Sequence, residues 1–344
     1  MNSYLQAPAD RRRRFCEEAQ AMLGLPAESI EKDFWVCWTL RELFTLPQSG
    51  SLLTFKGGTS LSKGWKLIQR FSEDIDVVID RDTLGFGGEK APQHPGISNK
   101  ERDRRLEALR MACQSHIRNL LAPELHARVE SCLAGATWTL EHDPDDKDAQ
   151  TLLFGYPSVF PSSRYLRPVV KIELGARSDT EPVAHPQIQP YLCEALPQVL
   201  GDGMFSVRTV APERTFWEKA MLLHEESFRI GTCQKARLAR HYYDLYCLIQ
   251  AGVGNRAASD HGLFDRVAAH RAVFFRKRKE TQESLRPGLL RLVPAPDRLA
   301  PWKQDYVAMS EAMFFGDVPE FDEILRAIGD FQQRISHPLA PPPA

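Results

Sequence analysis

The sequence has no excess of charge of either sign. Its 344 residues contain 44 Lys and Arg against 45 Asp and Glu, which gives a formal net charge of -1. A global positive field, the usual footprint of a nucleic-acid-binding domain, is therefore excluded. Any polyanion would have to be held by local groups of cationic side chains, so composition neither favours nor excludes RNA as a partner.

Paired cysteines and long apolar runs are also missing. The seven cysteines are scattered and form no C-x-x-C motif, so nothing indicates a zinc site or a redox centre. No apolar run approaches the roughly 20 residues that a membrane-spanning helix requires. Residues 1–14 are largely polar and end in four arginines. We expect a soluble, unexported, cytoplasmic protein with reduced thiols and no membrane partner.

The length suits roughly two domains. Helical and strand patterns are mixed up to about residue 200, and helical patterns dominate beyond Gly201-Asp202-Gly203. We therefore predict an α/β (α+β) fold, with N-terminal helices and a mixed sheet over residues 1–203 and a helical domain over 204–336. The tail 337–344 is half proline, and we expect it to be disordered.

One segment of the first domain carries two closely spaced carboxylates. Residues 71–79 alternate and are rich in β-branched side chains, which predicts a strand. Alternate residues share a face of a strand, so Arg70, Ser72, Asp74 and Asp76 are expected on one face. A hard divalent cation such as Mg²⁺, or Mn²⁺ in its place, would neutralise the two aspartates. Solvent-facing carboxylates on an edge strand explain most isolated Asp-x-Asp pairs.

A glycine turn precedes these aspartates. The apolar run 52–55 predicts a buried strand, and residues 60–67 resume a helical pattern after Lys56 and the turn Gly57-Gly58. A strand, a glycine turn and a helix N-terminus in this order expose backbone N–H groups that can bind phosphate. The next residues are Thr59 and Ser60, and the sequence leaves open which of them would contact the phosphate. An ordinary tight turn is the alternative.

A third carboxylate is expected on another strand. In residues 169–174, Lys171 and Glu173 share one face while Val170, Ile172 and Leu174 share the other. An ionised Glu in so apolar a strand needs a partner, which a metal ion or a neighbouring cation would supply. Three carboxylates on two strands beside a glycine turn favour a metal site.

These motifs resemble the AbiEii/AbiGii toxin family, a branch of the polymerase-β-like nucleotidyltransferase superfamily. The resemblance is carried by the glycine turn, by Arg70-x-Ser72-x-Asp74-x-Asp76 and by Lys171-x-Glu173. The segment 30–35 and two segments of the helical domain, 212–219 and 240–244, are also similar. The resemblance implies that Asp74 and Asp76 bind metal and that Glu173 assists them as a third acidic group. It also implies that Lys219 and Asp244 match positions of the helical domain that the family requires for function.

Three residues of the helical domain have open interpretations. A lysine near a triphosphate would offset the charge that develops on leaving pyrophosphate, which suits Lys219, although an exposed helix lysine is the alternative. Arg240 and Asp244 stand at i and i+4, where a plain salt bridge explains them equally well. We count Arg240 with Lys56, Gly57, Gly58, Thr59, Ser60, Arg70, Ser72 and Lys171 as candidate nucleotide-binding residues.

The predicted function is transfer of a nucleoside monophosphate from an NTP to an acceptor hydroxyl, with Mg²⁺ or Mn²⁺ as cofactor and release of pyrophosphate. The nucleotide is expected between the two domains. The resemblance implies a tRNA acceptor and a type IV toxin paired with a cognate antitoxin, as in abortive phage defence. The alternatives are a nucleotidyltransferase that modifies an antibiotic or a protein, and an inactive module that binds a nucleotide or a partner protein.

Overall fold

The computed structural model describes residues 1–161, 167–229, 236–276, 279–314 and 318–336. The chain forms two compact units. The first contains Met1–Gly64 and Ser72–Val210, and the second contains Trp65–Phe71 and Ala211–Ala344. The tail 337–344, for which we predict disorder, lies outside the described residues.

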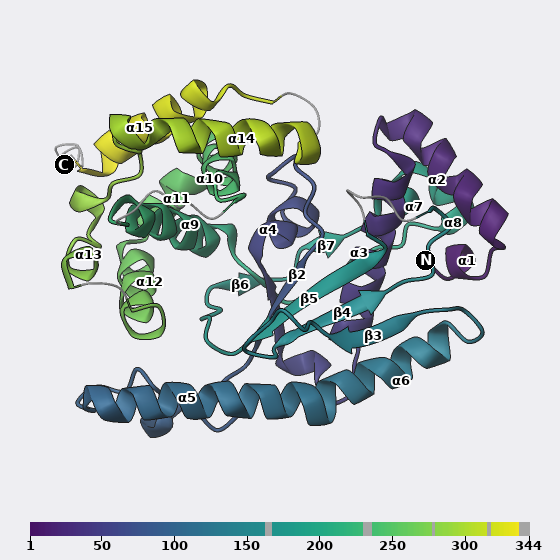
Figure 1. Cartoon of the computed structure of the whole chain (residues 1–344), viewed down its shortest axis with the longest axis horizontal. Coiled ribbons are helices and arrows are strands. Elements are labelled where there is room, and N and C mark those ends of the chain that lie inside the picture. Colours follow the sequence, from purple (N-terminus) through teal and green to yellow (C-terminus); the bar gives the residue numbers. More distant parts are fainter. Residues whose placement is uncertain (162–166, 230–235, 277–278, 315–317, 337–344) are drawn as a thin grey trace, which may run out of the picture. The chain divides into compact units, whose positions relative to one another are not determined.

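A seven-stranded mixed sheet forms the centre of the first unit, in the order β3-β4-β5-β2-β1-β9-β6 (Figure 1). Strand β2 is parallel to β5 and antiparallel to β1, and β1 is parallel to β9. The strands of this sheet are β1 (Leu53–Lys56), β2 (Ile75–Ile79), β3 (Thr139–His142), β4 (Thr151–Gly155), β5 (Val169–Gly175), β6 (Val183–Ala184) and β9 (Thr209–Val210). Strands β7 (Gln187–Ile188) and β8 (Phe205–Ser206) pair separately. The predicted mixed sheet is confirmed.

Helices flank this sheet, and one of them is buried on all sides. The helices of the first unit are α1 (Asn2–Leu5), α2 (Ala9–Leu23), α3 (Ala27–Phe44), α4 (Gly57–Thr59), α5 (Asn99–His116), α6 (Ala122–Cys132), α7 (Tyr191–Ala195) and α8 (Pro197–Leu200). Helix α3 contacts α2, α7 and β5, and 14 of its 18 residues are buried. Its Trp35 packs against Trp38, Phe154 and Tyr156, with ring centroids 5.4–6.1 Å apart. Burial on all sides places this helix in the core.

The strand expected over 71–79 is shorter than the sequence pattern suggests. It begins at Ile75, so the prediction that Arg70, Ser72, Asp74 and Asp76 share one strand face is wrong for the first three. Arg70 and Phe71 belong to the second unit, where Phe71 donates its N–H to the carbonyl of Met313 at 2.6 Å. The helix expected over 60–67 is also shorter: the helical segment ends with the π-helical turn Ser60–Gly64, because residues 65–71 belong to the second unit. The alternating pattern before Ile75 therefore does not mark a strand.

The second unit is helical, as predicted for the C-terminal part of the chain. Its helices are α9 (Pro212–Ser227), α10 (Arg240–Gln250), α11 (Val253–Ser259), α12 (His261–Phe274), α13 (Lys279–Glu283), α14 (Leu299–Met313) and α15 (Phe321–Ser336). Helix α9 contacts α10, α11 and α12, and α15 contacts α10. Phe216, Trp217 and Phe331 pack together at the centre of this bundle. Helix α9 therefore has a buried apolar face, which positions Lys219 within the unit.

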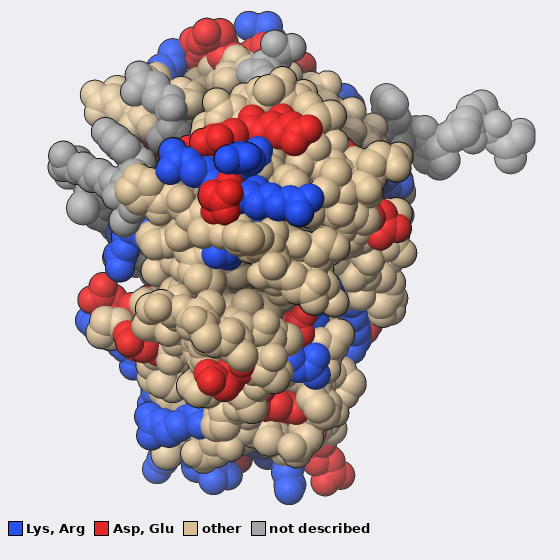
Figure 2. Space-filling view, turned by 90° about the vertical axis from the view of Figure 1, so that its right-hand side faces the viewer, with Lys and Arg blue, Asp and Glu red and all other residues tan. Residues whose placement is uncertain are grey.

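Charged side chains of both signs are interspersed on the face drawn in Figure 2. This distribution agrees with the balanced composition of the sequence. Within the described ranges, no helix has the length and apolar character that a membrane crossing requires.

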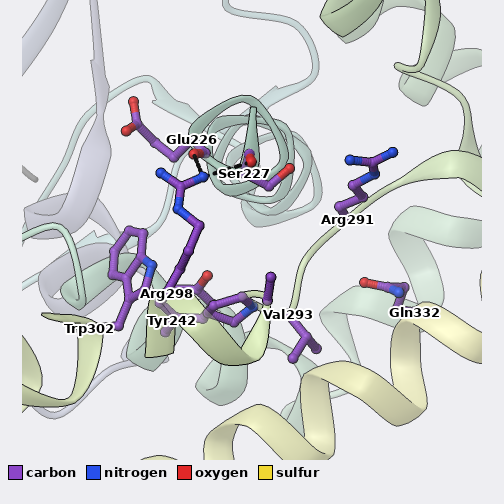
Figure 3. Close-up of a pocket in the computed structure, with 10 residues that line it drawn as sticks. Glu226, Ser227, Tyr242, Arg291, Val293, Arg298, Trp302 and Gln332 are labelled. Atoms are coloured by element: carbon purple, nitrogen blue, oxygen red, sulfur yellow. Dashed lines mark hydrogen bonds between the residues drawn. The ribbon is translucent and has the colours of Figure 1, made fainter. Parts of the chain in front are cut away.

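Arg298 closes the C-terminal end of α9. Its Nη1 donates to the carbonyl of Ser227 at 2.8 Å and to that of Glu226 at 3.5 Å, beside a cavity of about 190 Å³ (Figure 3). The last carbonyls of a helix have no partner within the helix, and a cation there also interacts favourably with the helix dipole. Arg298 thus stabilises the end of the helix that carries Lys219.

We predict that Arg298→Ala lowers the free energy of unfolding by about 1 kcal/mol, because two helix-terminal carbonyls lose a charged donor. Chemical denaturation followed by circular dichroism measures the change. Arg266→Ala is the matched control, because Arg266 is largely exposed and lies 3.6 Å from Asp260. Equal losses in the two variants would show that the contacts of Arg298 do not stabilise α9.

Candidate active site

Two carboxylates face each other on neighbouring strands of the first unit. The parallel register of β2 and β5 places Asp76 opposite Glu173 and Ile75 opposite Ile172. Both isoleucines are buried in the core, so the two carboxylates lie on the opposite face of the sheet. On the other side, the antiparallel register of β1 places Lys56 opposite Asp76. The structure therefore brings together three residues that the sequence analysis proposed separately.

The proximity of these carboxylates changes the protonation of Asp76. Burial and the neighbouring Glu173 carboxylate raise the pKa of Asp76 to about 7, Lys56 acts in the opposite direction, and Asp74 raises it further. Ionisation of Asp76 beside Glu173 is therefore unfavourable unless a cation binds next to the two carboxylates. An elevated carboxyl pKa of this kind is characteristic of a functional site.

The glycine turn is tied to the residues that precede β2. Thr59 donates its hydroxyl to the carbonyl of Asp74 at 2.5 Å and is hydrogen-bonded to the Ser72 hydroxyl at 2.8 Å. Ser60 donates to the carbonyl of Gly57 at 2.8 Å. Both Thr59 and Ser60 are buried. Their hydroxyls build the turn and hold Asp74, so backbone N–H groups are the better candidates for contact with a phosphate.

Gly57 is required where the turn meets Asp76. Its φ is 81°, in the left-handed region that favours glycine. A Cβ atom at this position would overlap the Oδ2 atom of Asp76. Gly57 therefore allows the backbone to pass directly beside this carboxylate, which brings the glycine turn and the carboxylate pair into one site.

Lys171 pairs with Glu173 on the same strand face, as the alternation predicted. Its Nζ lies 2.9 Å from Glu173 and 3.7 Å from Asp143. A hollow of about 390 Å³ opens here, lined by the carboxylates Asp143, Asp145, Asp146, Asp148 and Glu173 together with Gln150, Thr151, Lys171 and Leu174. Glu173 is thus accessible from solvent, with an ammonium beside it.

The donor set of this site fits a hard cation that completes its coordination with substrate. Among the described residues, no group of three or more His, Cys, Asp or Glu side chains is assembled to hold a metal ion. Mg²⁺ is commonly bound by one or two carboxylates together with substrate phosphates and water. Asp76 and Glu173 supply such a pair, and Asp74 directly precedes β2.

A second cluster of candidate residues lies within the helical unit. Arg70 binds Asp244 with two hydrogen bonds, from Nε to Oδ1 at 2.6 Å and from Nη2 to Oδ2 at 2.8 Å. Lys219 Nζ lies 2.8 Å from Asp244 Oδ2 and 3.5 Å from His241 Nδ1. Arg70, Lys219 and Asp244 are all buried. Two cations around one carboxylate leave a net positive charge.

The cations of this cluster favour the ionised form of Asp244. Burial opposes ionisation, but Arg70 and Lys219 hold the pKa of Asp244 far below its usual range. Burial lowers the pKa of Lys219, and Asp244 works against this effect. Burial and Lys219 also keep the pKa of His241 well below its ordinary value, so its ring is neutral.

Asp244 pairs with Arg70 and Lys219 and not with Arg240, the partner considered from the sequence. Both oxygens of Asp244 are engaged by Arg70, and one of them also by Lys219. Sequence reasoning did not identify this pairing, because Arg70 and Asp244 are 174 positions apart. It also did not assign a role to the buried Lys32, Asp33 and Lys63. Lys32 and Asp33 belong to a charged triplet inside an apolar helical pattern, in the segment 30–35 that is similar to the family, and no sequence pattern indicated Lys63.

Comparison with known proteins identifies the family. The model of the family described as "Nucleotidyl transferase AbiEii toxin, Type IV TA system" matches residues 38–327. The chain belongs to this family. This AbiEii-family protein is therefore a nucleotidyltransferase of the toxin class found in type IV toxin–antitoxin systems. The family has an antitoxin as partner and an NTP as substrate.

Other comparisons add little to this assignment. No curated protein matches the chain. Among solved structures, the nucleotidyltransferase toxin MenT4 from Mycobacterium tuberculosis H37Rv is similar over 94% of this chain and 98% of that chain, with 18% sequence identity and a TM-score of 0.41.

We predict that the metal-free AbiEii-family protein loses stability as pH rises, because of Asp76. The carboxyl has an ordinary pKa near 4 in the unfolded chain and a pKa of about 7 in the folded one. The folded state thus binds the proton more tightly. The stabilisation is fully present below about pH 4 and is lost by about pH 7.

Asp76→Asn should therefore melt at a higher temperature than the wild type at about pH 8, and the difference should disappear near pH 4. Thermal melts in chelator across this pH range measure it. A difference that does not change with pH would contradict the raised pKa.

We predict that Gly57→Ala lowers the rate of nucleotide transfer by on the order of 100-fold, because the new methyl group displaces Asp76. Gly85→Ala is the matched control, since Gly85 has a φ of 85° and nothing within 4 Å of an added Cβ. Both variants carry the strain of a left-handed residue, roughly 1–2 kcal/mol. Similar activity in the two variants would refute the close approach to Asp76.

Proposed function

We propose that this protein transfers a nucleoside monophosphate from an NTP to an acceptor hydroxyl on tRNA, with Mg²⁺ or Mn²⁺ as cofactor and release of pyrophosphate. The observation that carries the proposal is the pair formed by Asp76 and Glu173 on β2 and β5, where the pKa of Asp76 is raised to about 7. Such a pair calls for a cation, and the family supplies the reaction class.

The carboxylates of the first unit would hold the metal. Asp76 and Glu173 would supply one oxygen donor from each strand, and Asp74, the residue before β2, would supply a third when the ion is bound. When bound, Mg²⁺ polarises phosphate oxygens and stabilises both the attacking and the leaving oxygen in phosphoryl-type transfer. Lys171 has to share Glu173 with this ion, because its ammonium lies 2.9 Å from the carboxylate in the structure described.

The remaining residues of this site would bind and orient the nucleotide. The backbone N–H groups that follow Gly57 open a helical segment, where phosphate is favoured. Lys56 offsets the carboxylate charge beside Asp76. Thr59 and Ser72 hold the chain at Asp74, so their contribution is to fix the donor geometry. Gly58 allows the backbone to approach a phosphate closely.

The cationic cluster of the second unit would bind phosphate as well. Arg70 and Lys219 exceed the charge of Asp244 by one, and a buried excess cation favours an anionic ligand. Asp244 fixes the direction of both side chains. Because the Lys219 side chain is buried, water screens its charge only weakly. Lys219 would therefore be suited to stabilise the charge on departing pyrophosphate. Arg240 adds positive charge near Lys219.

The biological role that we propose is growth arrest through modified tRNA, relieved by a cognate antitoxin encoded nearby and used in phage defence. Family membership supports the toxin class, and the resemblance of the motifs supports the acceptor. The balanced surface charge implies that tRNA contacts are local rather than spread over the protein.

The test is transfer of labelled NTP by purified protein in the presence and absence of Mg²⁺. We expect Asp76→Asn and Glu173→Gln each to lower the rate by on the order of 100-fold or more, because each removes a metal ligand. Asp10→Asn should retain full activity, because Asp10 is an exposed residue of α2. Unchanged transfer in both carboxylate variants would remove the metal site from the mechanism.

The acceptor is tested in the same assay with tRNA, tRNA-depleted RNA, protein and aminoglycosides in separate reactions. Label in the tRNA alone supports the proposal. Label in protein or in an antibiotic would replace the proposed acceptor while leaving the chemistry intact.

A further inference from the structure

Three consecutive charged residues lie buried in the N-terminal half of α3. Glu31, Lys32 and Asp33 are 1%, 4% and 5% exposed. Successive residues of a helix point about 100° apart, so the three side chains leave α3 in different directions. Because this helix is buried around its circumference, each of them contacts a different segment of the first unit.

Lys32 joins the segments that lead into the two carboxylate strands. Its ammonium forms an ion pair with Glu73 and donates to the carbonyl of Arg167 at 3.1 Å. Glu73 immediately precedes Asp74 and β2, and Arg167 lies two residues before β5. One buried ammonium therefore contacts the chain three residues before Asp76 and six residues before Glu173.

Asp33 anchors the segment that begins with the glycine turn. Its Oδ1 lies 2.8 Å from Lys63 Nζ, and its Oδ2 accepts the N–H of Tyr191 at 2.7 Å. The Lys63 ammonium also lies 3.5 Å from the centre of the Tyr191 ring. Lys63 is the fourth residue of the π-helical turn Ser60–Gly64, which continues directly from Gly57–Thr59. The far end of this short helical segment is thus fixed to α3.

Glu31 holds a different segment. Its two carboxylate oxygens accept from the Val159 N–H at 2.8 Å and from the Ser158 hydroxyl. These residues follow β4, so these two hydrogen bonds of Glu31 reach neither Glu73 nor Arg167, the two residues that Lys32 contacts. Glu31 is therefore a natural comparison for its two neighbours, because it has the same helix, the same burial and a comparable number of contacts.

Stability alone is a weak reason for such a triplet. Replacement of a buried ion pair by well-packed apolar side chains is often neutral or stabilising. The contacts of Lys32 and Asp33 instead converge on the segments that carry the two halves of the candidate site. A supporting shell of this kind determines how accurately metal-binding and phosphate-binding groups are placed.

We propose that Lys32 and Asp33 are positioning residues for nucleotide transfer, Lys32 setting the spacing of the carboxylates on β2 and β5, and Asp33, through Lys63, setting the place of the glycine turn. This inference rests on the proposed function and deepens it. It assigns separate tasks to two adjacent residues, metal binding to the first and nucleotide binding to the second.

The experiment compares Lys32→Met with Asp33→Asn and Lys63→Met in the full chain, with Mg²⁺ and NTP titrated independently and all assays run well below each melting temperature. Lys32→Met should raise the Mg²⁺ concentration for half-maximal activity by about 10-fold or more and lower kcat, with KM for NTP nearly unchanged. Asp33→Asn and Lys63→Met should raise KM for NTP by about 10-fold, with the Mg²⁺ requirement nearly unchanged.

Glu31→Gln is the matched control, expected to lower the melting temperature without either kinetic change. Lys32→Arg keeps the charge and should recover part of the Mg²⁺ affinity. The double variant Asp33→Asn, Lys63→Met removes both charges of the pair, so it tests the link even if a single variant fails to fold. The proposal would be overturned if Lys32→Met and Glu31→Gln lost the same activity and if that loss simply paralleled the fall in melting temperature.

Failure of this proposal can be distinguished from failure of the proposed function. If the wild type transfers label to no acceptor, the proposed function fails. Calorimetry of Mg²⁺ binding in the presence of a non-hydrolysable NTP then tests the positioning residues directly. Unchanged binding by Lys32→Met and by the double variant would overturn their assignment, and the two separate affinity losses would support it.

Discussion

The candidate active site depends on one electrostatic constraint, the placement of Asp76 directly opposite Glu173 on adjacent parallel strands. Two carboxylates on neighbouring positions of a sheet repel each other, and burial together with this repulsion raises the pKa of Asp76. The surroundings act to reduce it. Lys56 lies on the next strand, Lys171 lies beside Glu173, and the backbone of Gly57 passes close to Asp76 without a side chain.

The same constraint explains why the supporting network is ionic. A metal site tolerates little displacement of its donors, so the segments before β2 and β5 need a common point of attachment. Lys32 provides it by contacting Glu73 and Arg167 from one ammonium. Apolar packing alone is less directional than a charged group with hydrogen bonds. The burial of α3, secured by Trp35 and its aromatic neighbours, keeps this ammonium away from water.

The sequence predicts those features of the site that depend on local pattern. Alternation along β5 correctly placed Lys171 and Glu173 on one face and Val170 and Ile172 on the other, because β5 is a regular strand of seven residues. The mixed sheet and the helical second part followed from periodicity in the same way.

The same reasoning failed for Arg70 and Ser72, because alternation does not show where a chain leaves a sheet. Arg70 has its partner 174 residues away, and pairings of that kind are not visible in a single sequence.

The partner of Asp244 shows how burial decides between a local and a distant contact. Arg240 lies one helical turn away, and an exposed pair at that spacing contributes only about 0.3–0.5 kcal/mol. Arg70 instead forms two hydrogen bonds with a fully buried carboxylate, and Lys219 forms a third contact. A buried carboxylate cannot rely on water, so it requires this more complete pairing. Asp244 therefore fixes the direction of two cationic side chains.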